Sequence, residues 1–144
     1  MTGGGTHNNN RARAETWLRS AQSDLEVARW NRQGDFHHIV CFQAQQAAEK
    51  ALKAFLVAHG ESNLRSHSTL ELLDRCVVYG SDMEALRADC RVLDRHYLPT
   101  RYPDALPAGA PVDAYGPEDA DDALARAEKV LHAVRVQLAR LWGA

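Results

Sequence analysis

Arg91 and His96 are the two residues of this chain whose types and spacing best suit acid–base chemistry on a phosphodiester. A histidine with a pKa near ~6.5 can take the proton of a 2′-hydroxyl group, and a guanidinium can hold a phosphate through two hydrogen bonds. On a continuous helix, however, the two side chains would lie about 140° apart. The spacing also recurs elsewhere in the chain: Arg32 before His37 and His38, and Arg126 before His132. The alternative is a surface arginine and a half-buried histidine without a catalytic role.

A second candidate is the run Arg-Tyr-Pro-Asp at Arg101–Asp104, which we interpret as a ligand-binding motif. Arg101 could grip a phosphate, and Tyr102 offers a ring on which a base could stack. Alternatively, Tyr102 fills the protein interior while Arg101 pairs with a carboxylate. All five prolines fall within Pro99–Pro117, and because proline breaks helices this segment is predicted to be a long loop. A long loop in a compact domain is usually either functional or disordered.

Gln46, Lys50 and Lys53 recur at successive turns of a predicted helix and share one polar face. The functional interpretation has them lining a ligand-binding cleft towards the proline-rich loop, where the two lysines would attract an anion. The alternative that we favour is a solvated face or a dimer contact. His67 precedes a helix-capping serine and is assigned to the helix entry rather than to catalysis.

No pattern in the sequence predicts a metal ion or a cofactor. Cysteine occurs three times, at positions 41, 76 and 90, and without a Cys-x-x-Cys pair, so neither a zinc site nor a disulfide is expected. The sequence also lacks a Gly-rich phosphate loop and a Gly-x-Ser-x-Gly motif.

The elements that must position these residues are predicted to be helices. Apolar residues recur every three or four positions over 13–32 and 36–59, with Asp35 as the expected cap of the second helix and Gly60 at its end. Two Ser-x-x-Glu capping boxes open helices over 68–78 and 81–97. Pro117 and the two acidic residues after it open the last helix. We predict an all-α fold: a five-helix up-and-down antiparallel bundle with a long proline-rich loop before the last helix.

Composition places this fold in one domain and limits its partners. Residues 1–12, rich in glycine and asparagine, are predicted to be a disordered tail before a single domain at 13–144. The chain has 17 basic and 19 acidic side chains, a net charge of −2, so any contact with nucleic acid must come from a local patch. No apolar run approaches the roughly 20 residues that cross a membrane, and no signal-peptide pattern is present. We expect a cytoplasmic protein without membrane contact.

Several of these motifs together resemble the HEPN family (higher eukaryotes and prokaryotes nucleotide-binding domain). The resemblance rests on Phe-Gln-Ala-Gln-Gln-Ala-Ala-Glu-Lys-Ala-Leu-Lys-Ala at residues 42–54, Gly60, His67 and the Arg-Tyr-Pro-Asp run, and it extends from about Arg13 to Leu141. It implies a helical bundle that forms a homodimer. Members often accompany a minimal nucleotidyltransferase in a toxin–antitoxin-like module.

Other HEPN proteins are metal-independent ribonucleases whose signature is an arginine, then a polar residue, with histidine following after four to six residues. Arg91 and His96 fit this spacing, although Val92 stands where the polar residue is preferred. Three functional hypotheses follow. The first is a binding module for a nucleotide, an RNA or a nucleotidyltransferase partner. The second is an endoribonuclease that uses Arg91 and His96, and the third is a helical dimer with an assembly role only.

Overall fold

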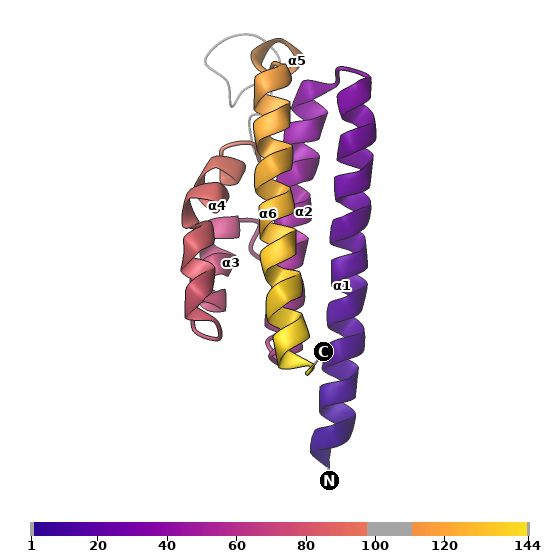
Figure 1. The fold of residues 1–144 in the computed structure, drawn as a ribbon, viewed down its shortest axis with the longest axis vertical. Helices are drawn as coiled ribbons and strands as arrows, with labels where there is room; N and C mark the ends of the chain where they lie inside the picture. The colour runs from indigo at the N-terminus through magenta and orange to yellow at the C-terminus, as the bar shows by residue number, and fades with distance from the viewer. Residues whose placement is uncertain (1, 98–110, 144) are drawn as a thin grey trace.

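The computed structural model describes residues 2–97 and 111–143 (Figure 1), and over these residues it contains helices and no strand. The elements in chain order are α1 (Thr2–Gln33), α2 (His37–Ala58), α3 (Thr69–Cys76), the 3-10 helix η1 (Ser81–Leu86), α4 (Arg87–Asp94), α5 (Pro111–Ala114) and α6 (Pro117–Leu141). The predicted all-α class is therefore confirmed. None of the described helices combines the length and the apolar character needed to cross a membrane.

Three long helices, α1, α2 and α6, form the main bundle (Figure 1). Arg32 near the end of α1 pairs with Asp121 near the start of α6 at 2.7 Å, so these two helices are antiparallel. Helix α2 returns along α1 after the turn at residues 34–36 and is antiparallel to it as well. Helices α2 and α6 therefore run in the same direction, and the chain crosses back between them through α3, η1 and α4.

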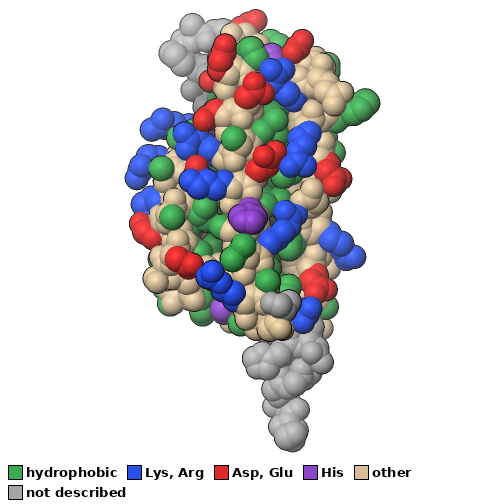
Figure 2. Space-filling model, viewed as in Figure 1, with side chains coloured by type: hydrophobic (Ala, Val, Ile, Leu, Met, Phe, Trp, Pro, Cys, Tyr) green, Lys and Arg blue, Asp and Glu red, His purple; other side chains and the backbone are tan. Residues whose placement is uncertain are grey.

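The crossover segment forms a smaller layer of its own. Helices α3 and α4 lie beside α2 and α6, on the side away from α1 (Figure 1). Figure 2 shows that both acidic and basic side chains lie on the face on which α6 is in front, with acidic ones gathered towards the upper end of the view. The long helices thus provide a rigid frame, and the short helices bring the segment at residues 66–69 against the middle of α2.

Helix α2 is the centre of the core. Five of its alanines are fully buried, and small side chains let neighbouring helix axes approach closely: Ala44, Ala47, Ala48, Ala51 and Ala54. The predicted apolar stripe of the last helix is buried along its whole length: Ala120, Ala123, Leu124, Ala127, Val130, Leu131, Val134 and Leu138. The periodicity of the apolar residues therefore identified the faces that pack.

Three predicted helix ends are confirmed in detail. The Ser68 hydroxyl accepts a hydrogen bond from the Glu71 amide at 3.1 Å and caps α3. Gly60 adopts φ +85°, and the bonds from the amides of Gly60 and Glu61 close a Schellman motif after α2. Pro117 is the first residue of α6.

Other helix starts differ from the prediction. Helix α1 begins at Thr2, where the sequence predicts a disordered tail, and from Arg11 the helix is tied to the bundle because the Arg11 guanidinium lies 4.6 Å from the centre of the Trp142 ring. Asp35 is not the cap of α2, because it adopts φ +59° in the turn and Phe36 occupies the cap position. Ser81 opens a 3-10 helix rather than an α-helix and makes no capping bond.

Candidate functional site

A buried ion pair lies at the centre of the candidate site. The ammonium of Lys53 donates to the carboxylate of Glu49 at 3.0 Å, and their side chains are only 5% and 4% exposed. Trp17 of α1 covers the pair, with the Lys53 Nζ atom 5.5 Å from its ring centre. The charges lie in a low-dielectric environment, in which their interaction with each other and with neighbouring groups is strong.

The sequence creates this site by placing polar residues on one side of an otherwise alanine-rich helix. Gln45, Glu49 and Lys53 follow one another at four-residue intervals, so their side chains line up along α2. Gln46 joins the row by donating to the side-chain oxygens of Gln45 at 2.7 Å and Glu49 at 3.3 Å. Gln45 in turn donates to the backbone carbonyl of His67 at 2.8 Å, which fixes the segment entering α3 against α2.

His67 connects the buried row to the surface. Its Nδ1 atom lies 3.3 Å from a Glu49 carboxylate oxygen, and its side chain is 58% exposed. The imidazole stacks on Tyr97, with ring centres 5.3 Å apart and planes 13° apart. A buried carboxylate therefore orients an exposed imidazole, whose ring can stack on another ring and whose Nε2 atom can exchange a proton.

Asp94 holds the segment that carries His67. Its carboxylate, at the end of α4, accepts hydrogen bonds from the backbone amides of Thr69 at 2.7 Å and Leu70 at 3.1 Å. It also accepts from the hydroxyls of Ser68 at 2.8 Å and Thr69 at 2.7 Å. The negative charge sits at the amino end of α3, where the helix dipole favours it.

Of the predicted ligand-binding residues, some belong to the buried row and others do not. Gln46 and Lys53 belong to the buried row described above. Lys50 lies alongside it, 2.8 Å from the carboxylate of Asp24 and 3.0 Å from the hydroxyl of Ser20. Both lysines are thus neutralised by a carboxylate, and the alternative of a solvated face does not hold for Lys53. Arg101 and Tyr102 lie outside the described residues.

Arg91 and His96 lie in different surroundings. Helix α4 ends at Asp94, so His96 lies in the turn beyond it and the angle calculated for a continuous helix does not apply. His96 is half-buried and meets the ring of Tyr115 edge-on at 5.5 Å, whereas Arg91 is exposed on α4. Burial lowers the pKa of His96 below its usual value, which keeps the imidazole neutral at physiological pH.

Four residues that organise this site were not predicted from the sequence: Trp17, Glu49, Tyr97 and Asp94. The row at four-residue intervals on α2 is a signal that could have identified Glu49, since a polar row inside an apolar helix needs partners. Trp17, Tyr97 and Asp94 come from other helices, and no local pattern connects them with α2. Among the described residues, no group of three or more histidine, cysteine, aspartate or glutamate side chains is arranged to hold a metal ion.

One family model covers most of this chain. The model of the HEPN domain matches residues 14–137, which is most of the chain. The chain belongs to the HEPN family. The residues of the buried row, Gln45 to Lys53, lie within this match, as do His67 and Asp94.

Three solved structures have an architecture similar to that of this chain. The protein TT1696 of Thermus thermophilus is 40% identical, with a TM-score of 0.79 over 85% of this chain and 96% of that one. The archaeal HEPN homologue ST0689 is 35% identical, with a TM-score of 0.73 over 86% and 96%. The HEPN domain protein TM0613 of Thermotoga maritima is 30% identical, with a TM-score of 0.69 over 87% and 98%.

One relative carries a functional name. "Putative toxin MJ1304" of Methanocaldococcus jannaschii is 29% identical to this chain over 140 residues, which is 90% of this chain and 91% of that protein. The chain is therefore similar, over most of both lengths, to a protein that bears this name.

Proposed function

We propose that this HEPN protein is a binding module for a nucleotide or an RNA, and that it acts with a minimal nucleotidyltransferase in a toxin–antitoxin-like pair. The observation that carries the proposal is the exposed His67 ring, which is stacked on Tyr97 and held by the buried carboxylate of Glu49. The toxin named among the relatives supports the second half of the proposal.

Each part of the site has a role in this function. The ring of His67 takes a base by stacking, an interaction that every base can make. Glu49 holds His67 through its contact with Nδ1, and Lys53 lies against the ring of Trp17, so the buried pair positions both rings. The phosphate is assigned to Arg101 and the second stacking ring to Tyr102, which follow Tyr97 closely in the sequence.

Binding of AMP, ATP and short single-stranded RNAs to the full chain tests the proposal, measured by calorimetry and by the shift in melting temperature. Loss of the stacking ring in His67→Ala is expected to weaken binding about 5- to 150-fold, since stacking of one base is worth about 1–3 kcal/mol. His132→Ala removes an exposed histidine of α6 and is the matched control. Equal affinity of the wild type and His67→Ala would refute the assignment of the site.

The partner half of the proposal has a separate test. A gene for a small nucleotidyltransferase is expected beside the gene for this chain, and the two proteins are expected to co-purify when expressed together. The absence of such a neighbour would count strongly against a two-protein module and leave the nucleotide site untouched.

A metal-independent ribonuclease is the second candidate function, and the surroundings of His96 favour it. The neutral imidazole that burial maintains is the form that accepts a proton from a 2′-hydroxyl. Incubation of total RNA with the protein in EDTA is expected to give cleavage that is lost in His96→Ala and in Arg91→Ala. Cleavage that survives His96→Ala would exclude this pair as the catalytic site.

A further inference from the structure

Among the residues that the structure describes, the ion pairs between α1 and α6 lie at one end of the contact between these helices. Towards the end of α1, Arg32 lies 2.7 Å from Asp121 and Arg29 lies 3.0 Å from Glu128. Each of these arginines is therefore neutralised by a carboxylate of the other helix. Arg135 lies about two helical turns after Glu128, where the same antiparallel arrangement brings it to α1 again.

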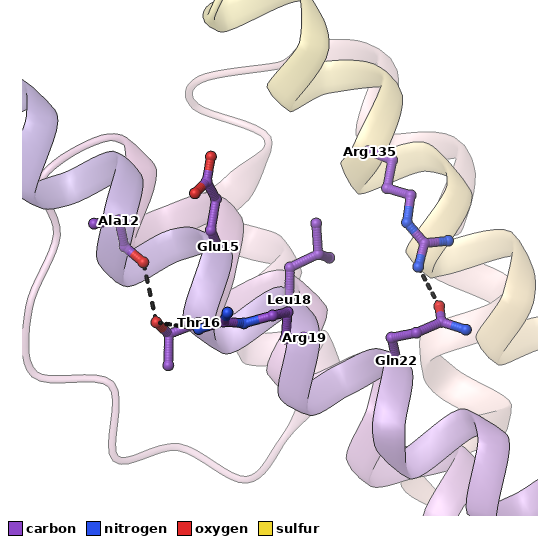
Figure 3. A pocket seen from close by; sticks show the side chains of 7 residues that line it. All are labelled: Ala12, Glu15, Thr16, Leu18, Arg19, Gln22 and Arg135. Carbon is purple, nitrogen blue, oxygen red and sulfur yellow. Dashed lines mark hydrogen bonds between the residues drawn. The ribbon is translucent and has the colours of Figure 1, made fainter.

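Arg135 meets a neutral side chain there, because its guanidinium donates to the amide oxygen of Gln22 (Figure 3). Arg19 precedes Gln22 by about one turn of α1 and donates to the hydroxyl of Thr16 at 3.4 Å. Over residues 2–97 and 111–143 neither arginine forms an ion pair, and both are exposed. Two guanidinium charges are therefore uncompensated on neighbouring helices.

Arg19 and Arg135 line one hollow, the first from α1 and the second from α6 (Figure 3). The hollow has a volume of about 580 Å³, which is in the range of sites for small organic ligands. Glu15 also lines it, but the carboxylate of Glu15 is paired with Arg11 at 3.0 Å. The hollow thus presents two uncompensated positive charges and a carboxylate that is already neutralised, which favours an anion as its occupant.

A second hollow continues this surface on the side of α1 nearer α2. It has a volume of about 350 Å³, shares Thr16 with the first hollow and is lined also by Arg13, Trp17 and Ser20. In the part of the chain that the structure describes, Arg13 has no ion pair either, and it lies about 9 Å before Arg19 along the helix axis. These guanidiniums are spread too far for one phosphate group, whereas a chain of phosphates carries a negative charge at every link.

We infer that the two hollows form a binding site for a chain of phosphates, held by Arg19 and Arg135 between α1 and α6 and by Arg13 beyond Thr16. A guanidinium suits this task because its planar fork donates two hydrogen bonds to one phosphate. A free polyphosphate and the backbone of an RNA strand both carry this chemistry. The inference does not rest on the stacking site at His67, since none of the three arginines belongs to that site.

Calorimetric titration of the full chain with inorganic tripolyphosphate tests the arginines directly. The wild type is expected to bind, and Arg19→Gln and Arg135→Gln are each expected to raise the dissociation constant about 10-fold or more, since hydrogen bonds between charged groups are lost. Arg65→Gln removes an equal charge from an exposed position between α2 and α3 and is the matched control. A wild type that does not bind, or a dissociation constant unchanged in both variants, would overturn the inference.

Gln22→Glu tests the uncompensated charge without removing an arginine. The new carboxylate would extend the row of ion pairs between α1 and α6 and neutralise Arg135, so the affinity for tripolyphosphate is expected to fall about 10-fold. The helical content measured by circular dichroism is expected to stay unchanged. A Gln22→Glu variant that binds tripolyphosphate as tightly as the wild type would contradict the role of Arg135.

A comparison of tripolyphosphate, a short oligouridylate and a short oligoglutamate identifies the source of the chain. If the source is RNA, the three arginines give a slope of about −2 for log affinity against log salt concentration, and Arg13→Gln reduces its magnitude by about 0.7. Binding of tripolyphosphate without binding of RNA identifies a free polyphosphate. Oligoglutamate that binds more tightly than both phosphate ligands would overturn the choice of phosphate in favour of an acidic protein segment.

His67→Ala separates this inference from the function proposed above. Tripolyphosphate has no base, so its affinity is expected to be the same in His67→Ala and in the wild type. A loss of tripolyphosphate binding in His67→Ala would contradict a separate phosphate site. Unchanged binding of nucleotides in that variant would instead count against the stacking site alone.

Discussion

Lys50 and Lys53 are neighbours on one helix, and each pairs with one carboxylate, but their surroundings differ. Lys50 and Asp24 are both 26% exposed, so water screens the pair and its net contribution to stability is small. Lys53 and Glu49 are almost completely buried. A buried pair adds little over apolar residues of the same size, but the loss of one partner leaves an unpaired charge away from water.

Lys53→Met is therefore expected to lower the free energy of unfolding by about 3 kcal/mol. Lys50→Met, the matched control, is expected to lower it by about 1 kcal/mol or less, since water can solvate Asp24. Urea unfolding followed by circular dichroism measures both. Similar losses in the two variants would show that the Glu49 charge is not isolated by burial.

The sequence predicted the polar face of α2 but not its burial. Gln46, Lys50 and Lys53 were recognised from their spacing on one helix, which is local information. The residues that cover this face lie elsewhere in the chain: Trp17 belongs to α1, and His67 follows the end of α2. Burial of this kind depends on how distant segments pack, and it cannot be predicted from the spacing of residues within one helix.

At the scale of elements, the carboxylate of Asp94 joins α3 and α4, two short helices that would not be stable alone. Helices α3 and α4 have eight residues each, fewer than an isolated helix needs in water. Asp94 at the end of α4 binds two backbone amides and two hydroxyls at the start of α3. The two helices therefore stabilise each other and together hold the His67 segment.

Asp94→Ala is expected to destabilise the protein by about 3 kcal/mol, because hydrogen bonds to a charged group and the helix-dipole interaction are lost together. Ser68→Ala removes one capping oxygen of α3 and is expected to cost about 1 kcal/mol. Thermal unfolding of both variants gives the comparison. An Asp94→Ala variant no less stable than Ser68→Ala would contradict the role assigned to this carboxylate.

Two identical sequence patterns gave different elements, and the difference has a structural cause. Ser68 and Ser81 both begin a Ser-x-x-Glu box, but only Ser68 caps an α-helix. After Ser81, the carboxylate of Asp82 contacts α6: it accepts a hydrogen bond from Gln137 at 2.7 Å and lies 3.2 Å from the guanidinium of Arg140. The chain forms a 3-10 helix here instead of an α-helix. Helix α6 could be predicted because its apolar periodicity extends over many residues. A four-residue Ser-x-x-Glu box is a weaker signal, and tertiary contacts can outweigh it.

At the scale of the whole molecule, the burial of several histidines makes the stability of the fold depend on pH. Burial lowers the pKa of His38, His59 and His96 below the ordinary value of a histidine. In the unfolded chain these side chains take up protons near pH 6.5, while in the folded protein they resist protonation. Stability is therefore complete above the unfolded pKa and falls as the pH decreases below it.

The melting temperature is accordingly expected to fall between pH 7.5 and pH 5.5, and His96→Gln is expected to reduce the slope. Differential scanning calorimetry at constant ionic strength measures this dependence. The pH range of this test ends at pH 5.5, so that carboxylates do not contribute to the change in stability. Basic or hydroxyl partners lower the pKa values of three of them: Glu61, Glu84 and Asp121. These carboxylates therefore lose their contribution to stability only at more acidic pH. A melting temperature that is constant or rises towards pH 5.5 would contradict the prediction.

The parallel course of α2 and α6 sets an order for the assembly of the chain. Helices α1 and α2 meet across a turn of a few residues, and their contacts close a short loop. Helix α6 reaches α2 only after α3, η1 and α4 have carried the chain back along the bundle. Because loop closure over a longer segment costs more entropy, the α1–α2 hairpin can form first and serve as the template. The last helix of the sequence is then also the last to join the core, so its docking completes the native state.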